Sequence, residues 1–78
     1  MRDFSTAVLF AEGATSQVYR AIHEPSGRHV AIKTLKSDDP GLVRRFRLEA
    51  EALGRLDHPG IARLVEAGIH EGRPFIAT

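Results

Sequence analysis

The sequence predicts an α+β fold in which a five-stranded antiparallel sheet packs against a single helix. Two features of the chain predict this class. Five short β-prone runs are separated by turn residues, and strands joined by links of hairpin length pair antiparallel. Between the third and fourth runs, apolar residues recur at spacings of three and four, the period of a helix with one apolar face. The expected order of elements is therefore β, β, β, α, β, β.

The first three strands are expected at residues 4–12, 16–24 and 29–35. The first run is β-prone and stops at Gly13. The second and third runs are separated by Pro25-Ser26-Gly27, in which proline fixes φ and glycine tolerates the left-handed region. A hairpin is therefore predicted between them.

The third strand divides its side chains into two sets, because successive side chains of a strand face opposite sides of a sheet. Val30 and Ile32 form one set. Ala31 and Lys33 form the other set and are expected to share a face.

A helix is expected over residues 40–54. An aspartate in Ser37-Asp38-Asp39-Pro40 can cap its start, and Pro40 suits the first helical position, where the missing N–H would have no partner anyway. Gly54 is suited to end the helix. One apolar stripe runs along it, formed by Leu42, Phe46, Ala50 and Leu53.

The last two strands are expected at residues 61–69 and 73–78. They follow the turn cluster Asp57-His58-Pro59-Gly60 and are joined around Glu71-Gly72. The final strand reaches Thr78 with no cap, polar tail or turn after it. The chain is therefore expected to be one domain, residues 1–78, interrupted after its fifth strand.

Length and composition indicate one small globular domain. With 78 residues, the chain is expected to hide only about 60 to 65% of the surface that it exposes when unfolded, so its stability should be low. A formal net charge of +1, and strands without paired exposed aromatics, give no support to a nucleic-acid partner. The single basic cluster, Arg44, Arg45 and Arg47, is interpreted as a solvated helix face in preference to a phosphate contact.

Several other kinds of site are also disfavoured by the sequence. It has no cysteine, which excludes disulfides and thiolate metal sites. Its four histidines lie in separate predicted elements, so no metal site is expected, and His58 is assigned to shaping the turn after the helix. The longest apolar run, residues 7–11, is far shorter than the ~20 residues of a membrane helix, so no membrane contact is expected. A cytoplasmic location is the resulting expectation.

Glu49 and Lys33 are the residues that most strongly indicate chemistry. Glu49 lies three residues after Phe46 and four before Leu53, so its carboxylate is expected on or beside the buried stripe, where a cation must meet it. Lys33 lies in an apolar strand and can supply that cation. Either residue alone is better explained as a surface side chain with a buried stem. Together they form a reciprocal pair, and an ammonium held in this way is well placed to grip phosphate oxygens.

The turn between the first two strands is the second candidate for a site. Residues 11–18 are mostly small, so their backbone can approach a ligand closely and present N–H groups to phosphate. With only one glycine inside it, the turn taken alone is better explained as an ordinary hairpin connection.

Three stretches resemble motifs of protein kinases, in the same order and with the same spacing. Residues 10–21 resemble the glycine-rich loop, whose pattern is G-x-G-x-x-G-x-V and whose middle glycine is kept as Gly13. Val30-Ala31-Ile32-Lys33 matches the V-A-I-K signature of the third strand. Glu49 falls where the family has its helix glutamate, ten residues before Pro59.

The passage from the helix to the fourth strand carries the most specific part of this resemblance. Residues 46–64, which include Leu53-Gly54-Arg55-Leu56-Asp57-His58-Pro59 and Ile61, are similar to this passage in bacterial and eukaryotic serine/threonine kinases. The resemblance as a whole covers residues 8–78.

The resemblance implies the ATP-binding N-terminal lobe of a serine/threonine protein kinase. In that family the loop covers the nucleotide phosphates, and the strand lysine contacts the α and β phosphates while the helix glutamate holds it. The ATP-binding residues implied in this chain are Phe10, Ala11, Glu12, Gly13, Ala14, Thr15, Ser16, Val18, Ala31, Lys33, Glu49 and Thr78. Val18 and Ala31 would pack on adenine, Thr78 would be the gatekeeper, and Leu53 and Leu64 would join the hydrophobic stack between the lobes.

The departures from the family pattern limit what the chain is expected to do. Ala11 and Ser16 replace two loop glycines, the first adding a Cβ that restricts φ and the second a hydroxyl. The 78 residues contain no His-Arg-Asp or Asp-Phe-Gly segment, which in kinases supply the catalytic base and the magnesium ligands. ATP and Mg are the implied cofactors, but no catalytic or metal-binding residue is expected within this chain.

Two functions remain open at this point. The first is the ATP-binding lobe of a kinase that transfers the γ-phosphate to protein hydroxyls, with this piece inactive alone and completed by a C-terminal lobe that also meets the protein substrate. The alternative is a non-enzymatic, pseudokinase-like docking module that binds another protein through apolar surface.

Overall fold

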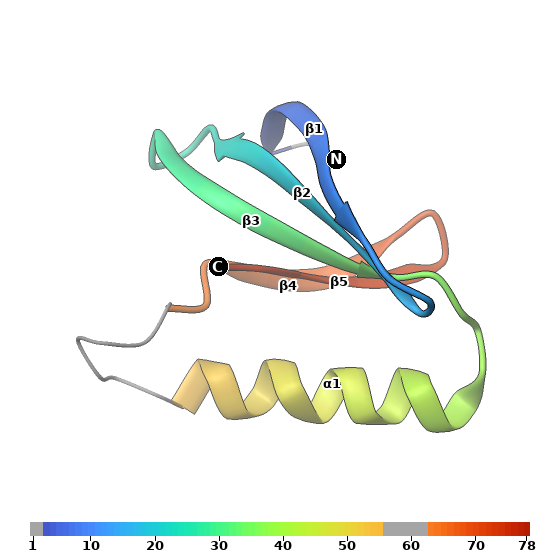
Figure 1. The fold of residues 1–78 in the computed structure, drawn as a ribbon. Helices are drawn as coiled ribbons and strands as arrows, with labels where there is room; N and C mark the ends of the chain where they lie inside the picture. Colours follow the sequence, from blue (N-terminus) through green and yellow to red (C-terminus); the bar gives the residue numbers. More distant parts are fainter. Residues whose placement is uncertain (1–2, 56–62) are drawn as a thin grey trace.

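The computed structural model describes residues 3–55 and 63–78, which form a five-stranded antiparallel sheet with one helix along one of its faces (Figure 1). The predicted class and element order are confirmed. The elements are β1 (Phe4–Glu12), β2 (Ser16–His23), β3 (Arg28–Leu35), α1 (Pro40–Arg55), β4 (Glu66–His70) and β5 (Arg73–Ala77).

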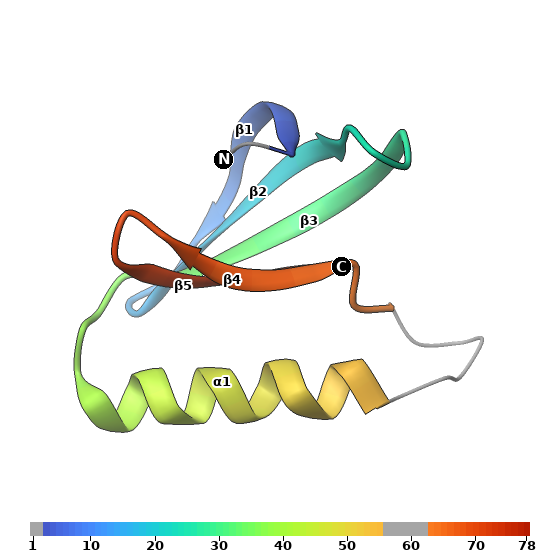
Figure 2. The same ribbon diagram turned by 180° about the vertical axis from the view of Figure 1, so that it is seen from behind.

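The strands lie in the order β1-β2-β3-β5-β4, and every neighbouring pair is antiparallel. The helix therefore connects two strands, β3 and β4, that flank β5 on either side. In both views α1 runs beneath the β4 and β5 side of the sheet, and β1 lies farthest from it (Figures 1 and 2).

Two apolar clusters form the core, one on each face of the sheet. The first contains strand residues, with Tyr19 and Val65 packed against the buried set of Phe4, Ala21, Val30, Ile32, Phe75 and Ala77. The second lies between sheet and helix, where Leu35, Phe46 and Ile76 are buried. The predicted helix stripe, Leu42, Phe46, Ala50 and Leu53, packs in this second cluster.

The alternation predicted for β3 is confirmed by burial. Val30 and Ile32 are 5% and 1% exposed in the first cluster. Ala31 is exposed and Lys33 is half-buried on the other face, toward α1. The strand thus places its apolar set in the core and its lysine on the helix side.

The two predicted tight turns use glycine where the backbone requires it. Gly27 has a φ of 70° and its N–H donates to the carbonyl of His23 at 2.7 Å. Glu71 and Gly72, which join β4 to β5, have φ values of 52° and 78°. Two consecutive residues with positive φ match the twist of a two-residue hairpin.

The helix starts as predicted. The side-chain Oδ1 of Asp39 accepts a hydrogen bond from the Gly41 N–H at 3.2 Å, and the Asp39 carbonyl accepts one from the Val43 N–H at 2.9 Å. Asp39 is therefore the N-cap, and Pro40 takes the first position, where no N–H is needed. The helix ends at Arg55, one residue beyond the expected end.

The predicted fourth strand, residues 61–69, was wrong at its start, because β4 spans Glu66–His70. Its partner explains the difference: β5 ends at Ala77, which pairs with Glu66 and accepts a last hydrogen bond from the Val65 N–H at 2.8 Å. No further β5 residue remains to extend the ladder. Residues 61 and 62, the predicted turn at residues 57–60 and the role given to His58 lie outside the described residues.

Within the part of the chain that the structure describes, no helix combines the length and the apolar character needed to cross a membrane.

Candidate functional site

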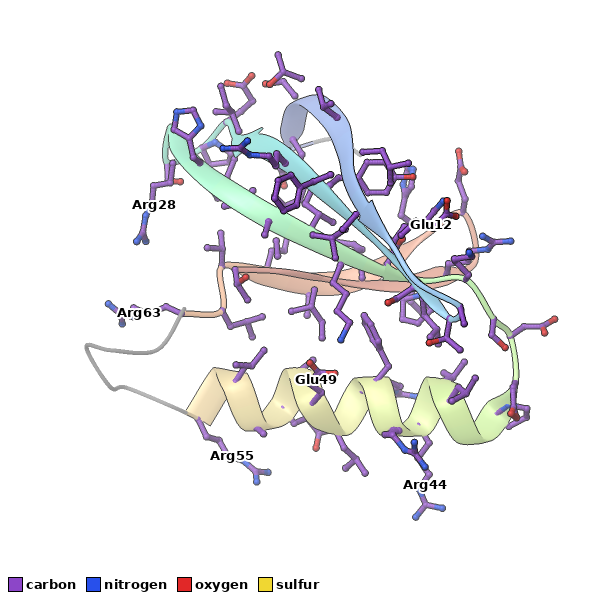
Figure 3. The ribbon with its side chains drawn as sticks, viewed as in Figure 1. Glu12, Arg28, Arg44, Glu49, Arg55 and Arg63 are labelled. Atoms are coloured by element: carbon purple, nitrogen blue, oxygen red, sulfur yellow. The ribbon has the colours of Figure 1, made fainter. Side chains whose placement is uncertain are left out.

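Lys33 on β3 and Glu49 on α1 meet across the layer between sheet and helix. Their Nζ and Oε1 atoms are 3.4 Å apart, so the predicted pair forms. Glu49 lies on the side of α1 that faces the sheet (Figure 3). The expected burial is wrong, however, because the two side chains are 41% and 47% exposed. Both therefore keep contact with water, and neither charge depends on the other to remain in the fold.

The groups around Lys33 hold its stem while leaving its ammonium accessible. Its Nζ lies 5.9 Å from the centroid of the buried Phe46 ring, which favours a cation at that position. On either side in the sheet, Lys33 pairs with Val18 of β2 and Ile76 of β5. The base of Lys33 therefore lies between two aliphatic cross-strand neighbours, and its ammonium lies near one aromatic ring.

The structure places Ala31 and Thr78 side by side. The Ala31 N–H donates to the Thr78 carbonyl at 2.9 Å, and the Thr78 N–H donates to the Ala31 carbonyl at the same distance. Val18 and Ala31 lie on the same face of the sheet as Lys33, by the register of β2 with β3. Small and aliphatic side chains therefore surround the base of Lys33 on the helix side of the sheet.

The β1–β2 connection, residues 13–15, is a tight turn closed by its own backbone. The Gly13 N–H donates to the Ser16 carbonyl at 2.9 Å, and the Lys36 N–H donates to the Thr15 carbonyl at 2.7 Å. Phe10 is 65% exposed, with the Arg20 guanidinium 5.2 Å above its ring. The turn is therefore tied both to itself and to the end of β3. The other exposed residues of this region are Ala11, Glu12, Gly13, Ala14 and Thr15.

Ala11 fits the loop without backbone strain. Among the described residues, the only non-glycine positions with positive φ are Thr6 and Glu71, so Ala11 occupies a backbone region open to any residue. It lies beside an irregularity in the β1–β2 register, between Leu9 and Ala11. Its Cβ therefore does not prevent the hairpin from forming.

Leu53 and Leu64 come together where the helix ends. Both are half-buried in the cluster formed around Phe46. A Cβ added at Gly54 would approach Cδ2 of Leu64 to 3.3 Å, so the absence of a side chain at Gly54 lets the segment before β4 pass close to α1. The two leucines expected to form a hydrophobic stack do pack in one cluster.

Lys36 is a feature of the site that the sequence reasoning missed. Its Nζ donates to Oε2 of Glu12 at 2.9 Å and to the carbonyl of Gly13 at 3.0 Å. Gln17 adds a second donor to the same carboxylate oxygen at 2.9 Å, and Tyr19 donates to Gln17 at 3.1 Å. These hydrogen bonds from Lys36 and Gln17, with the charge of Lys36, hold the pKa of Glu12 below its ordinary value of 4.5.

The site thus offers an accessible ammonium, an exposed small-residue loop and an apolar surface beside them. An ammonium and backbone N–H groups suit an anionic ligand with an apolar part, such as a nucleotide. For metal, the residues at 3–55 and 63–78 bring no three histidine or acidic side chains together.

The chain is similar in sequence to bacterial serine/threonine-protein kinases. It is 44% identical over 63 residues to PknA of Mycobacterium tuberculosis, a match that covers 77% of this chain and 15% of the relative. It is 39% identical over 75 residues to the DNA damage-responsive kinase RqkA of Deinococcus radiodurans, covering 92% of this chain and 11% of that protein. The chain therefore spans a small part of the relatives that it matches. No family model matches it.

Two solved protein structures have a fold similar to that of this chain. The apo form of PpkA-294 superposes with a TM-score of 0.80 at 22% identity, covering 99% of this chain and 35% of the other, which shows the fold alone. Rad53 1-466 in complex with AMP-PNP superposes with a TM-score of 0.71 at 28% identity, covering 96% of this chain and 20% of the other.

Proposed function

We propose, from the premise that this chain has the sequence and the fold of a serine/threonine-protein kinase N-terminal lobe, that it binds the phosphates and the base of ATP on the helix side of its sheet. The observation that carries the proposal is the Lys33–Glu49 contact at 3.4 Å, formed by two residues 16 positions apart that the sequence alone had paired.

Lys33 is assigned to the α and β phosphates. Its ammonium is 41% exposed, so it can reach an oxyanion without leaving Glu49 entirely. A long contact to a solvated carboxylate competes weakly with a charge-assisted bond to phosphate. Glu49 then acts by limiting the directions that the ammonium can take.

The loop and the apolar surface are assigned to the two ends of the nucleotide. Residues 13–16 would lie over the phosphates, with Gly13 at the point of closest approach. Val18 and Ala31 would contact adenine, with Phe10 on the loop side and Thr78 at the far edge. The Ala31–Thr78 hydrogen bonds support this arrangement, because they fix Thr78 beside Ala31.

Phosphoryl transfer to protein serine or threonine hydroxyls is proposed for a protein that joins this lobe to the remaining kinase groups. The 78 residues contain neither segment that holds Mg and the catalytic base in kinases, so the chain alone should be inactive. Residues 1–78 would then be an ATP-binding lobe whose opposite wall, and protein substrate, belong to a C-terminal lobe. A cytoplasmic location follows for such a lobe, because ATP is its ligand.

A titration with Mg and ATP tests the proposal. The chain is followed by its amide NMR spectrum, which first establishes that it is folded, with Lys33→Met measured alongside. Binding should be weak, because the described sheet supplies one wall, whereas ligand pockets usually enclose most of their ligand. Saturable shifts at Gly13, Val18 and Lys33 that vanish in the variant support the proposal. A folded chain without shifts at millimolar ATP overturns it.

A docking module is the second candidate, favoured by exposed apolar side chains. Val8 and Phe10 on the edge strand β1, and Ile69 on the edge strand β4, are 63%, 65% and 74% exposed, and exposed apolar surface can favour association. This candidate predicts concentration-dependent shifts at these three residues in the absence of nucleotide. Spectra that do not change with protein concentration would count against self-association as its basis.

A further inference from the structure

Lys36 stands three residues after Lys33, directly after β3 ends at Leu35. Its ammonium shares the Glu12 carboxylate with Gln17. Gln17 lies on the face of the sheet opposite Lys33, because its neighbour Val18 is the residue that pairs with Lys33. There Lys36 lies behind the β1–β2 loop. Its ammonium makes two short contacts, one to each end of the Glu12-Gly13 dipeptide, at 2.9 Å to the carboxylate and 3.0 Å to the Gly13 carbonyl. Its backbone N–H makes a third, to the Thr15 carbonyl at 2.7 Å.

These three contacts join one residue at the end of β3 to both sides of the loop. Gly13 leads into the turn and Thr15 leads out of it, so the loop cannot lift from the sheet without breaking bonds to Lys36. The Lys36 side chain is 29% exposed, less than that of Lys33 at 41%, and two of its three ammonium donors are bonded to Glu12 and Gly13. Lys36 therefore has little capacity left for a ligand of its own.

Lys36 also compensates the negative charge of Glu12. A carboxylate within a loop that is to receive phosphates raises the free energy of the bound anion, unless a cation stays close to it. Lys36 and Gln17 both donate to Oε2 of Glu12, at 2.9 Å each, on the side of the loop away from Lys33. The Glu12 carboxylate is therefore held on the face away from Lys33, where Lys36 compensates its negative charge.

We propose that the Lys36 side chain is a positioning group that holds the phosphate loop, on the face away from Lys33, through the Glu12 carboxylate and the Gly13 carbonyl. This inference rests on the proposed function for its ligand. Lys36 orders the loop before the nucleotide arrives and neutralises Glu12, without touching ATP itself. The expected consequence is an effect on phosphate binding and on loop order, with little effect on adenosine or on overall stability.

The test compares Lys36→Met with Lys36→Arg, in which the guanidinium can still donate to Glu12 and to a carbonyl. The matched control is Arg44→Met, which removes the same charge from an exposed position on the side of α1 away from the sheet (Figure 3). We expect Lys36→Met to weaken ATP binding by about three- to tenfold, the scale of losing an ordered loop and one compensating charge. Lys36→Arg and Arg44→Met should stay within about twofold of the original chain.

Two further readouts separate positioning from a general loss of structure. Adenosine affinity should not change in Lys36→Met, because adenosine has no phosphates for the loop to cover. Adding Glu12→Gln to Lys36→Met should recover part of the lost ATP affinity, because it removes the uncompensated carboxylate. Equal losses for ATP and adenosine, or no recovery in the double variant, would overturn the charge and positioning role.

A measurement without ligand keeps this inference distinct from the proposed function. In the free chain, the heteronuclear NOE of the amides at residues 13–16 should fall in Lys36→Met and remain unchanged in Arg44→Met. If the original chain does not bind ATP, the proposed function fails, and the heteronuclear NOE measurement still tests whether Lys36 orders the loop. If it binds ATP, and Lys36→Met changes neither affinity nor loop order, the inference fails alone.

Discussion

The two lysines of the chain, Lys33 on β3 and Lys36 directly after it, are used in different ways on the two faces of the sheet. Lys33 meets Glu49 at 3.4 Å and has 41% of its side chain exposed. Lys36 meets Glu12 at 2.9 Å, holds the Gly13 carbonyl as well and is 29% exposed. An ammonium with one long contact is available to a ligand, whereas an ammonium with two short hydrogen bonds serves to hold the loop beside it.

Disrupting the buried apolar cluster around Phe46, next to Lys33, should have the largest effect on stability. Phe46 is 5% exposed and packs with Leu35 and Ile76, so Phe46→Ala is expected to cost about 3 to 5 kcal/mol of unfolding free energy, the range for emptying a buried aromatic site. Chemical denaturation followed by circular dichroism measures this cost. Phe46→Leu, which keeps most of the apolar volume, should cost clearly less. Equal costs would mean that the ring does not support the helix layer.

Lys33→Met tests the ligand-binding role of Lys33, as opposed to the structural role of Lys36, most directly. We expect it to lower the affinity for ATP about tenfold or more, to below detection, because the phosphates lose a charged hydrogen-bond donor. The unfolding free energy should change by less than about 1 kcal/mol, since the pair that it breaks is solvent-exposed. Isothermal titration and denaturation of the same samples give both values. A large loss of stability with ATP binding intact would reverse the roles assigned here.

Glu49→Gln should act in the same direction as Lys33→Met and more weakly. The amide keeps the shape of the side chain and loses its charge, so the ammonium is guided less firmly and ATP binding should weaken by about two- to fivefold. Glu51→Gln, an exposed neighbour on the same helix, serves as the control for charge alone. An equal effect of the two substitutions would show that only the net charge of the helix matters.

The smallest expected effect concerns the titration of Glu12. Its pKa is held below 4.5 by donors from Lys36 and Gln17, so the Lys36–Glu12 contact is complete above the unfolded-state pKa and is lost as the pH falls through the lowered value. Carboxyl-detected NMR should show a midpoint below 4.5 in the original chain. In Lys36→Met the midpoint should rise toward 4.5. A midpoint that does not move would place the cause elsewhere than Lys36.

Much of the fold followed from short-range patterns in the sequence. The alternation of Val30 and Ile32 predicted the buried face of β3, and the glycines at 27 and 72 predicted two turns that do use positive φ. The pairing of Lys33 with Glu49 also followed, because two charged residues in apolar surroundings each called for a partner. Local periodicity determines these features, and a single sequence contains it.

Features that depend on register were not predictable in this way. Lys36 lies beside Glu12 because β1 and β2 pair with two irregularities and because β3 ends next to their turn. Thr6, a β-branched residue, has a φ of 54° at one of these irregularities, which no local propensity favours. The start of β4 depended on where β5 ends, and the exposure of Glu49 on how closely α1 approaches the sheet. Each is set by contacts between distant segments.

The central claim, that Lys33 contacts the ligand and Lys36 does not, can be tested directly on the two side chains. With only two lysines in the chain, a ¹⁵N spectrum of the lysine ammonium groups contains two signals to follow during titration with Mg and ATP. We expect the Nζ signal of Lys33 to shift saturably, while that of Lys36 stays near its position in the free chain. A shift of Lys36 as large as that of Lys33, or a shift of Lys36 alone, would contradict this claim.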